Sequence, residues 1–350
     1  MKSKSFFTLF LIALLSLQFV SCTEEKSNGP SASTHLWPAK MNGKWGFIDA
    51  KGNMVINAQY DDAGFFSCGL ADVKMADRWW YINTKGALKS LPSSNAVNAP
   101  FYNNYAVISD GNNYGIINTF MDYVLQPMYS YLGNVAQNGW VAFSYDGYLY
   151  GYKNVMSDQE ITPSYEYAYD FVGSYAVVYV GGKYGVINSS GNIVIQPIYD
   201  NQLIALTNNR FGFAGDNGYY GLLDESGNVV VQPIYASIVY LNGIGYDVTK
   251  IDWYPVKNTS GQWGYIDASG NEKLAFQYDD VWPFVENLAF VEINNKWLCI
   301  DKTGNVVYSL GDNEEPKGYY RNGLVLTYDD HEGIYYYKDT QGHTVYMWTN

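Results

Sequence analysis

Hydrophobic and polar residues alternate along most of the chain, and short polar turns interrupt the alternation at regular intervals. The segment from Tyr175 to Gln196, YAVVYVGGKYGVINSSGNIVIQ, is representative: two alternating runs meet at Gly-Gly, and a third follows the polar tetrad SSGN. Alternation with a period of two is typical of β-strands, and pairs such as Gly-Gly or Asn-Gly are typical of the turns between them. The pattern predicts an antiparallel meander of three strands.

The same unit recurs with a period of about 35 residues. An aligned aromatic residue opens the central strand of each of nine copies: Trp45, Trp79, Tyr114, Tyr150, Tyr184, Tyr220, Trp263, Trp297 and Tyr335. Four residues later each copy has Asp or Asn, and three residues after that seven of the nine have Gly, with Met121 and Ser157 as the exceptions. Asp or Asn that opens a turn and Gly that closes it favour a type I turn with a glycine bulge. Each copy is therefore expected to contain this hairpin.

The three strands of a copy are expected around Leu70 to Lys74 for the first, Trp45 to Asp49 for the second and Met54 to Asn57 for the third. A short connection should then lead to the next copy. Four copies have a proline near this point, and proline, which cannot donate to a sheet, is expected to end the third strand there. These residues are Pro127, Pro163, Pro197 and Pro233.

The repeated residues resemble the WG repeat, a bacterial module with the pattern W-G-x-I-D-x-x-G-x-x-V-I, then Y-D, then G-L-A-x-V. The segments KWGFIDAKGN from Lys44, KYGVINSSGN from Lys183 and QWGYIDASGN from Gln262 carry the resemblance, which extends from His35 to the end of the chain. Copies two and eight depart from it, since Trp80 and Leu298 replace the glycine. The resemblance implies a β-repeat, usually in an exported or surface setting, and implies no defined activity.

A three-stranded meander of this size cannot bury its own apolar face, so neighbouring copies must stack. Stacking around a ring gives a β-propeller, and stacking along a line gives an open β-solenoid or superhelical array. Whole copies at both ends and a count of nine favour the open array, whereas meander sheets of this kind are what propellers are made from. We predict propeller-like packing, with the open array as the alternative. Either arrangement is expected to bury the side of the central strand that carries Gly46 and Ile48 against the next sheet.

The N-terminal residues indicate export. Two lysines precede an apolar run from Phe6 to Val20, which is typical of a signal peptide covering residues 1–21. Phe19-Val20-Ser21-Cys22 resembles the lipobox of bacterial lipoproteins, with Phe19 where Leu is usual, and the resemblance implies lipidation of Cys22. Residues 22–34 then form a flexible polar tether ahead of the repeat domain, residues 35–350. We expect a lipid-anchored protein of the outer membrane or cell surface, or alternatively of the periplasm, that contacts the membrane through its anchor alone.

The charge of the chain argues against one class of partner. With 34 acidic and 21 basic side chains the formal net charge is -13, and Lys and Arg do not cluster, so nucleic-acid binding is not expected.

Candidate ligand-binding residues are sought where the repeat pattern breaks, because nine aromatics at one structural position are most simply packing residues. The segment TKIDWYPVKNTSGQ before Trp263 adds about eight residues to the first hairpin of its copy, and is expected to expose Asp252, Trp253 and Tyr254 as a binding loop. The alternative is that its aromatics fold back onto the next repeat. The other candidates are the off-pattern tryptophans Trp80, Trp140 and Trp282.

The sequence shows no Ser-His-Asp arrangement, nucleophile elbow or phosphate loop, so no catalytic residue, metal ligand or cofactor is predicted. The favoured hypothesis is a non-catalytic binding or scaffold protein of the cell envelope with a protein or glycan partner. The alternative is an enzyme, a polysaccharide hydrolase or lyase with scattered carboxylates on a propeller scaffold.

Overall fold

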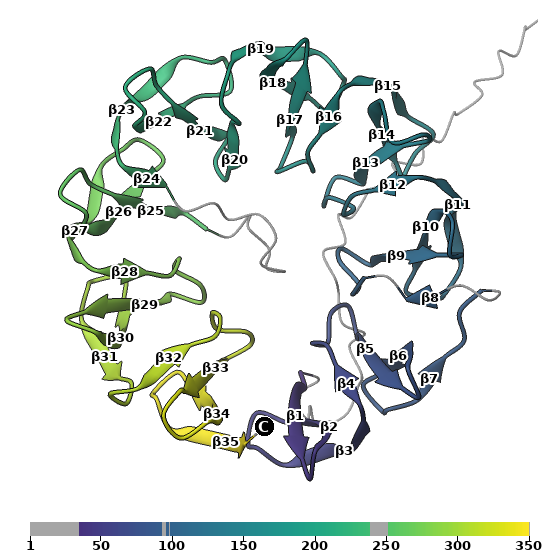
Figure 1. Ribbon diagram of the computed structural model, residues 1–350, viewed down its shortest axis with the longest axis vertical. Coiled ribbons are helices and arrows are strands. Elements are labelled where there is room, and N and C mark those ends of the chain that lie inside the picture. The colour runs from purple at the N-terminus through teal and green to yellow at the C-terminus, as the bar shows by residue number, and fades with distance from the viewer. Residues whose placement is uncertain (1–34, 93–95, 98, 239–250, 350) are drawn as a thin grey trace, which may run out of the picture.

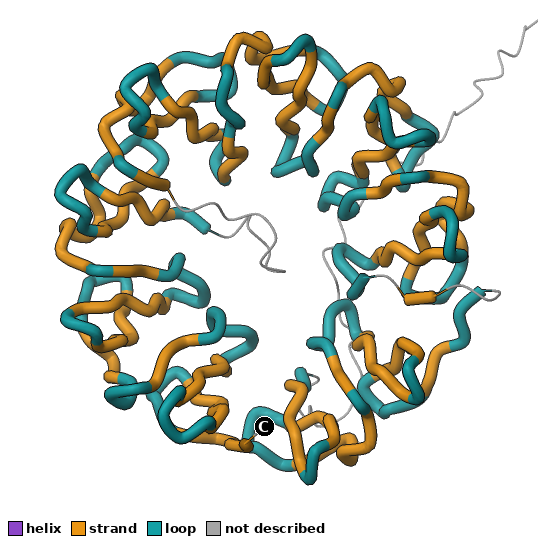
Figure 2. The backbone as a smooth tube through the Cα atoms, in the orientation of Figure 1, coloured by secondary structure: helices purple, strands orange, loops and turns teal. Residues whose placement is uncertain are grey.

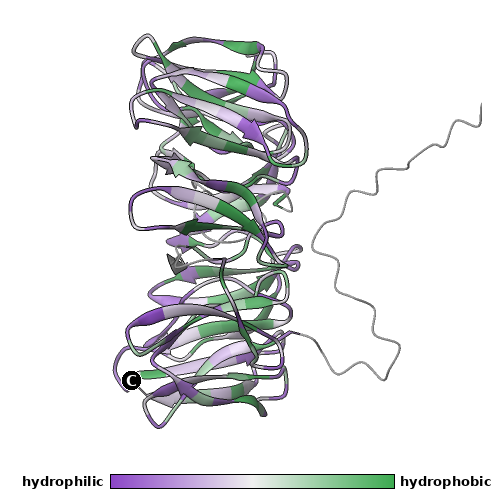
Figure 3. Cartoon of the chain, turned by 90° about the vertical axis from the view of Figure 1, so that its right-hand side faces the viewer, coloured by the Kyte–Doolittle hydropathy of each residue, from purple (hydrophilic) through white to green (hydrophobic). Residues whose placement is uncertain are grey.

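The chain folds into nine small antiparallel sheets arranged as the blades of a closed ring (Figure 1). The structure is a computed structural model, and it describes residues 35–92, 96–97, 99–238 and 251–349. These residues form strands and loops without a helix (Figure 2), and seen from the side the ring is a flat disc (Figure 3). Residues 1–34, which carry the predicted signal peptide, Cys22 and tether, lie outside the described residues.

Each blade is a meander whose strands follow one another in chain order. The strands that correspond to the predicted first strand are β1 (Trp37–Met41), β5 (Leu70–Met75), β9 (Tyr105–Ser109), β13 (Trp140–Ser144), β17 (Tyr175–Val180), β21 (Arg210–Ala214), β25 (Trp253–Lys257), β29 (Leu288–Ile293) and β33 (Leu324–Asp329). The predicted second strand is β2 (Lys44–Ile48), β6 (Arg78–Asn83), β10 (Tyr114–Asn118), β14 (Tyr150–Asn154), β18 (Lys183–Asn188), β22 (Tyr220–Leu223), β26 (Trp263–Asp267), β30 (Lys296–Asp301) and β34 (Ile334–Asp339).

The predicted third strand lies at the rim of the ring in Figure 1, and we call it the rim strand. The rim strands are β3 (Met54–Tyr60), β7 (Leu88–Lys89), β11 (Tyr123–Tyr129), β15 (Glu160–Tyr165), β19 (Ile193–Tyr199), β23 (Val229–Tyr235), β27 (Glu272–Tyr278), β31 (Val306–Ser309) and β35 (Thr344–Thr349). Eight blades begin with a further short strand that the sequence analysis assigned to a connection: β4 (Asp62–Ala63), β8 (Ala96–Val97), β12 (Tyr131–Leu132), β16 (Tyr167–Ala168), β20 (Ile204–Leu206), β24 (Ser237–Ile238), β28 (Asp280–Val281) and β32 (Glu314–Pro316).

The blades pack face to face, and nine hydrophobic clusters fill the nine interfaces between them. Phe47 of blade 1 packs with Val73 of blade 2, whereas Ile48, the next residue, packs with Trp348 of blade 9. An open array of nine sheets would have eight such interfaces, so the ninth cluster closes the ring. The propeller prediction is confirmed and the open array is excluded.

Closure uses side chains rather than an exchanged strand. Blade 1 and blade 9 are each built from one end of the described chain. The Trp37 indole donates a hydrogen bond to the carbonyl of Arg321 (3.0 Å), and the Trp45 ring lies edge-on to Trp348 at 5.9 Å between centroids.

The side of the central strand that carries Gly46 and Ile48 is buried against a neighbouring sheet, since Ile48 packs on blade 9, but the glycine of the WG pair makes its own close approach within its blade. A Cβ on Gly46 would lie 2.5 Å from the carbonyl oxygen of Ile56 in the adjacent rim strand, and the register between the two strands shifts at this point. The same close approach recurs at Gly115, Gly151, Gly185, Gly221 and Gly264. Where Trp80, Leu298 or Tyr336 replaces the glycine, the rim strand has no register shift at that position.

The prolines do not end the third strand as expected. Pro127, Pro163, Pro197 and Pro233 all lie inside rim strands. A rim strand pairs with a neighbour on one side only, and its register shifts opposite the glycine. A backbone N–H at the proline position would therefore have no partner in the sheet, so proline costs no hydrogen bond there.

Candidate functional site

The loops that join the first short strand of a blade to the next strand turn toward the middle of the ring (Figure 2), and we call them the inner loops. Several contain a tight turn whose two central residues have positive φ, for example Glu286-Asn287 (53° and 66°) and Asn322-Gly323 (51° and 86°). Asn and Gly adopt this conformation at low cost, which explains why the sequence places them ahead of the strand.

Hydrogen bonds between neighbouring blades fix the inner loops. The Asn103 side chain donates to the carbonyl of Val135 (2.9 Å), and the Asn138 side chain donates to that of Gly173 (2.8 Å). Between blades 8 and 9 the Glu286 carboxylate accepts the backbone N–H groups of Asn322 (2.6 Å) and Gly323 (2.9 Å). The inner face of the ring is therefore a pre-organised surface, which lowers the entropic cost of binding a ligand.

The inner loops of blades 2, 8 and 9 enclose a pocket with β1 of blade 1, at the place where the ring closes. Its volume is about 130 Å³, and it is partly open to solvent. The lining residues are Trp37, Phe65, Trp282, Lys317, Gly318, Tyr319, Arg321, Leu324, Leu326 and Tyr337. Apolar and aromatic walls with a few polar groups are typical of small-molecule sites.

The polar groups of this closure pocket are cationic. The Arg321 guanidinium lies 4.6 Å from the Phe65 ring and 5.4 Å from the Tyr319 ring. Burial raises the pKa of Tyr319, and the charge of Arg321 partly opposes the rise. The Lys317 ammonium forms an exposed ion pair with Glu315 at the margin of the pocket. Stacking on two rings fixes the orientation of the guanidinium, so its N–H groups are presented in one plane.

The expectation of an enlarged, exposed hairpin before Trp263 is wrong. β25 and β26 are joined by five residues, 258–262, as many as join β13 to β14, and the additional residues of this copy precede β25. Some of them, residues 239–250, lie outside the described residues. The extra length therefore lies in the sequence between β24 and β25.

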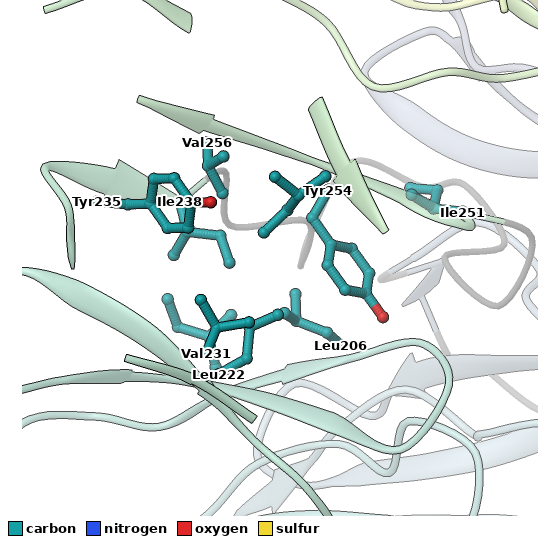
Figure 4. Close-up of a cluster of buried hydrophobic side chains, with 10 residues drawn as sticks. Leu206, Leu222, Val231, Tyr235, Ile238, Ile251, Tyr254 and Val256 are labelled. Atoms are coloured by element: carbon teal, nitrogen blue, oxygen red, sulfur yellow. The ribbon is translucent and has the colours of Figure 1, made fainter. Parts of the chain in front are cut away.

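The two aromatics of this segment are packing residues. Tyr254 is completely buried between blades 6 and 7 beside Leu206 and Leu222 (Figure 4), and its hydroxyl donates to the carbonyl of Thr207 (2.8 Å). Trp253 points to the opposite side of β25, packs edge-on against Phe284 of blade 8 and is half-buried.

The charged candidate beside them also links two blades. Asp252 forms an ion pair with Lys302 of blade 8 (2.7 Å). The alternative expectation, that the aromatics of this segment fold back onto the next repeat, describes Trp253, whereas Tyr254 packs on the preceding repeat.

The other predicted tryptophans have three different settings. Trp140 is 4% exposed and stacks on Phe171 in the interface between blades 4 and 5. Trp80 is half-buried, and the Arg78 guanidinium lies 4.5 Å from its ring. Trp282 alone lines the closure pocket.

Sequence reasoning missed most of the closure pocket, above all Phe65, Lys317, Tyr319 and Arg321. One sequence signal was available: Gly or Asn stands directly ahead of the strand in several copies, and the structure gives positive φ to it and to the residue before it, at Cys68-Gly69, Asn103-Asn104, Asn208-Asn209, Glu286-Asn287 and Asn322-Gly323. Alignment on this pair would have placed Phe65 and Arg321 in equivalent inner loops.

Among the described residues, three carboxyl groups have a raised pKa. Burial is the main cause for Asp72 of blade 2 and for Glu292 of blade 8. Burial also raises the pKa of Asp170 of blade 5 to about 6, although its Oδ2 accepts hydrogen bonds from the backbone and side chain of Asn134. None of the three lines the closure pocket.

In the part of the chain that the structure describes, no cluster of three His, Cys, Asp or Glu side chains could hold a metal ion. A search of the same residues for a helix long and apolar enough to cross a membrane finds none.

The fold and its repeating unit define a nine-bladed β-propeller made of tandem meander repeats. Six segments match the family described as WG containing repeat: residues 45–79, 114–148, 150–184, 184–201, 220–244 and 263–297. Each match begins at an aromatic residue followed by glycine, and the copies with Trp80, Leu298 and Tyr336 are those at which no match begins. The chain belongs to the WG containing repeat family.

A comparison with solved structures finds similar chains at low identity. BamB from Moraxella catarrhalis is 10% identical, with 90% of this chain and 87% of that chain covered and a TM-score of 0.37. The computationally designed Ika8 protein is 13% identical, with coverage of 82% and 95% and a TM-score of 0.42. Apo AztD from Citrobacter koseri is 11% identical, with coverage of 90% and 94% and a TM-score of 0.41. At these scores the likenesses carry no argument about function. A search of curated protein sequences finds no significant match.

Proposed function

We propose that this propeller is a non-catalytic binding protein of the cell envelope, held by a lipid on Cys22, whose partner is a protein or a glycan. The observation that carries the proposal is the closure pocket, in which residues of four blades bring aromatic walls and two cationic side chains together. A partner that sits there contacts several blades at once.

The rigidity of the inner face supports a binding role. Hydrogen bonds donated by Asn103 and Asn138 and accepted by Glu286 hold inner loops of adjacent blades in place before any partner arrives. A pre-organised aromatic site is the arrangement that gives high affinity for a given contact area.

An enzymatic role would need a different arrangement. A glycoside hydrolase uses two carboxyl groups roughly 5 to 9.5 Å apart across a cleft. The carboxyls with raised pKa, Asp72, Asp170 and Glu292, belong to blades 2, 5 and 8, and the closure pocket is lined by none of them. Binding is therefore the better-supported proposal.

The proposal is tested with the purified full-length protein on an array of envelope and dietary glycans and in pull-downs from envelope extract. Trp282→Ala removes a wall of the pocket, and Trp80→Ala removes a half-buried tryptophan that does not line it. We expect the wild-type protein to bind a partner. Trp282→Ala should bind the same partner at least tenfold more weakly, and Trp80→Ala should bind it with unchanged affinity. Blank results for wild type in both assays, or equal binding by both variants, would refute the proposal.

A further inference from the structure

We infer that the closure pocket binds a carboxylated sugar, a uronic acid unit of an acidic polysaccharide or a sugar of the same chemistry. The inference rests on the proposed binding function and specifies its ligand class. It begins with charge. The chain has a net charge of -13, yet the ten residues that line the pocket include Lys317 and Arg321 and no Asp or Glu. The pocket lining is therefore positively charged although the chain as a whole is negatively charged, and this favours an anionic ligand.

The geometry of Arg321 favours a planar anion. Its guanidinium lies against the rings of Phe65 and Tyr319, at 4.6 and 5.4 Å, which holds it in one orientation. The guanidinium also donates a hydrogen bond to the Tyr319 hydroxyl (3.3 Å), and its five N–H donors form a planar fork whose geometry matches that of a carboxylate.

Lys317 can supply a second, adaptable charge. It pairs with Glu315, and the two side chains are 37% and 46% exposed. An ion pair with this exposure contributes little to stability, so Lys317 can exchange Glu315 for the carboxylate of a ligand at small cost.

The remaining walls suit a sugar ring. Trp282 offers aromatic surface against which the C–H face of a pyranose can pack, beside the Arg321 guanidinium that lies over Phe65 and Tyr319. One end is open to solvent, as a site for a unit within a longer polysaccharide requires.

The test compares a uronic acid oligosaccharide with its carboxyl-reduced neutral counterpart by isothermal titration calorimetry on the full-length protein. We expect the acidic sugar to bind at least tenfold more tightly, and its affinity to fall with salt while that of the neutral sugar does not. Arg321→Gln should remove most of the difference between the two sugars. Arg321→Lys, which keeps the charge and loses the planar fork, should restore only part of it.

The controls separate the pocket from general charge and from misfolding. Lys183→Gln removes a cation that pairs with Asp200 in blade 5, far along the chain from the pocket, and should leave both affinities unchanged. If Arg321→Gln fails to fold, Lys317→Gln at the exposed margin gives the same comparison with a smaller expected loss of three- to tenfold.

Several results would overturn the inference and leave the proposed function standing. They are equal binding of the acidic and neutral sugars, tighter binding of inorganic phosphate or a nucleotide than of the uronate, and a protein partner that Trp282→Ala loses while no sugar binds. A blank result for every sugar and every protein would overturn both proposals.

Discussion

The hydroxyl of Tyr337 in blade 9 donates a hydrogen bond of 2.9 Å to the carbonyl of Pro38 in blade 1, which lies 299 residues earlier in the chain. The same contact joins internal blades. Tyr81 donates to Ala99 (2.6 Å), Tyr152 to Tyr169 (2.8 Å) and Tyr265 to Trp282 (2.7 Å), and each tyrosine stands two residues after the aligned aromatic. The ring therefore closes with an interface that it also uses between blades joined along the chain.

Tyr337→Phe should lower the free energy of unfolding by about 1 to 2 kcal/mol, because the buried Pro38 carbonyl loses its donor while the ring volume stays in place. The matched control is Tyr81→Phe, which removes the equivalent bond between blades 2 and 3 and should cost a similar amount. Urea denaturation followed by tryptophan fluorescence measures both. No loss for Tyr337→Phe beside a clear loss for Tyr81→Phe would show that the ring is open in solution.

The turn glycine of blade 1 gives a second test of closure. Gly52 has φ +81°, and a Cβ there would lie 2.3 Å from the carbonyl oxygen of Val345 in blade 9. Gly43 has nearly the same backbone, φ +77°, with no atom within 4 Å of its Cβ position. Both alanine variants cost the strain of the left-handed region, about 1 to 2 kcal/mol. Gly52→Ala should cost about 1 to 3 kcal/mol more because the backbone of blade 9 must shift. Equal midpoints of unfolding for the two variants would contradict the closed ring.

The repeat residues explain why the blades could be predicted. Asp49 accepts backbone hydrogen bonds from Lys51 and Asn53, and Gly52 takes the positive φ, so the turn is fixed by residues that are adjacent in sequence. The expected strand ranges agree with β2, β3 and β5 to within a few residues, apart from the rim strand, which continues to Tyr60.

Features that depend on distant contacts could not be predicted. A strand of two residues such as Tyr167–Ala168 has no alternation to detect. Both faces of β25 are covered, by blade 6 and by blade 8, so alternation on that strand does not mark a solvent face and Tyr254 was misplaced. The closure pocket joins Trp37 to Arg321, 284 residues away, and only the ring brings them together.

The lipid anchor is tested at Cys22. We expect the wild-type protein to fractionate with membranes and its N-terminal peptide to begin with an acylated cysteine in a mass spectrum. Cys22→Ala should leave the protein in the soluble fraction or with its signal peptide uncleaved, because the thioether attachment site is lost. Recovery of unmodified wild-type protein in the soluble fraction would rule out the anchor while leaving the propeller unaffected. Accessibility of the anchored protein to protease added to whole cells distinguishes the outer face from the periplasm.

Asp170 makes stability depend on pH, and the sign follows from its raised pKa. Its Oδ1 is buried without a hydrogen-bond partner among the described residues, and the Asn134 side chain donates to its Oδ2. Burial, and after it the charge of Asp170, raises the pKa of the neighbouring Tyr131 and Tyr152. With a pKa of about 6 in the fold and 3.8 as the ordinary value, the folded protein holds a proton that the unfolded chain has released. Stability should therefore fall as pH rises from about 4 to 6 and then level off.

Between pH 5.0 and 7.5 this carboxyl should remove about 1 to 1.5 kcal/mol from the free energy of unfolding. Asp170→Asn cannot ionise and should lack this part of the pH dependence, so the difference between wild type and variant isolates it from Asp72 and Glu292, whose raised pKa values act in the same direction. Urea midpoints of both proteins at the two pH values measure this difference. The stability of Asp170→Asn relative to wild type should increase as the pH rises. Parallel curves for the two proteins would mean that Asp170 titrates as it does in the unfolded chain and that water reaches its Oδ1 between blades 4 and 5.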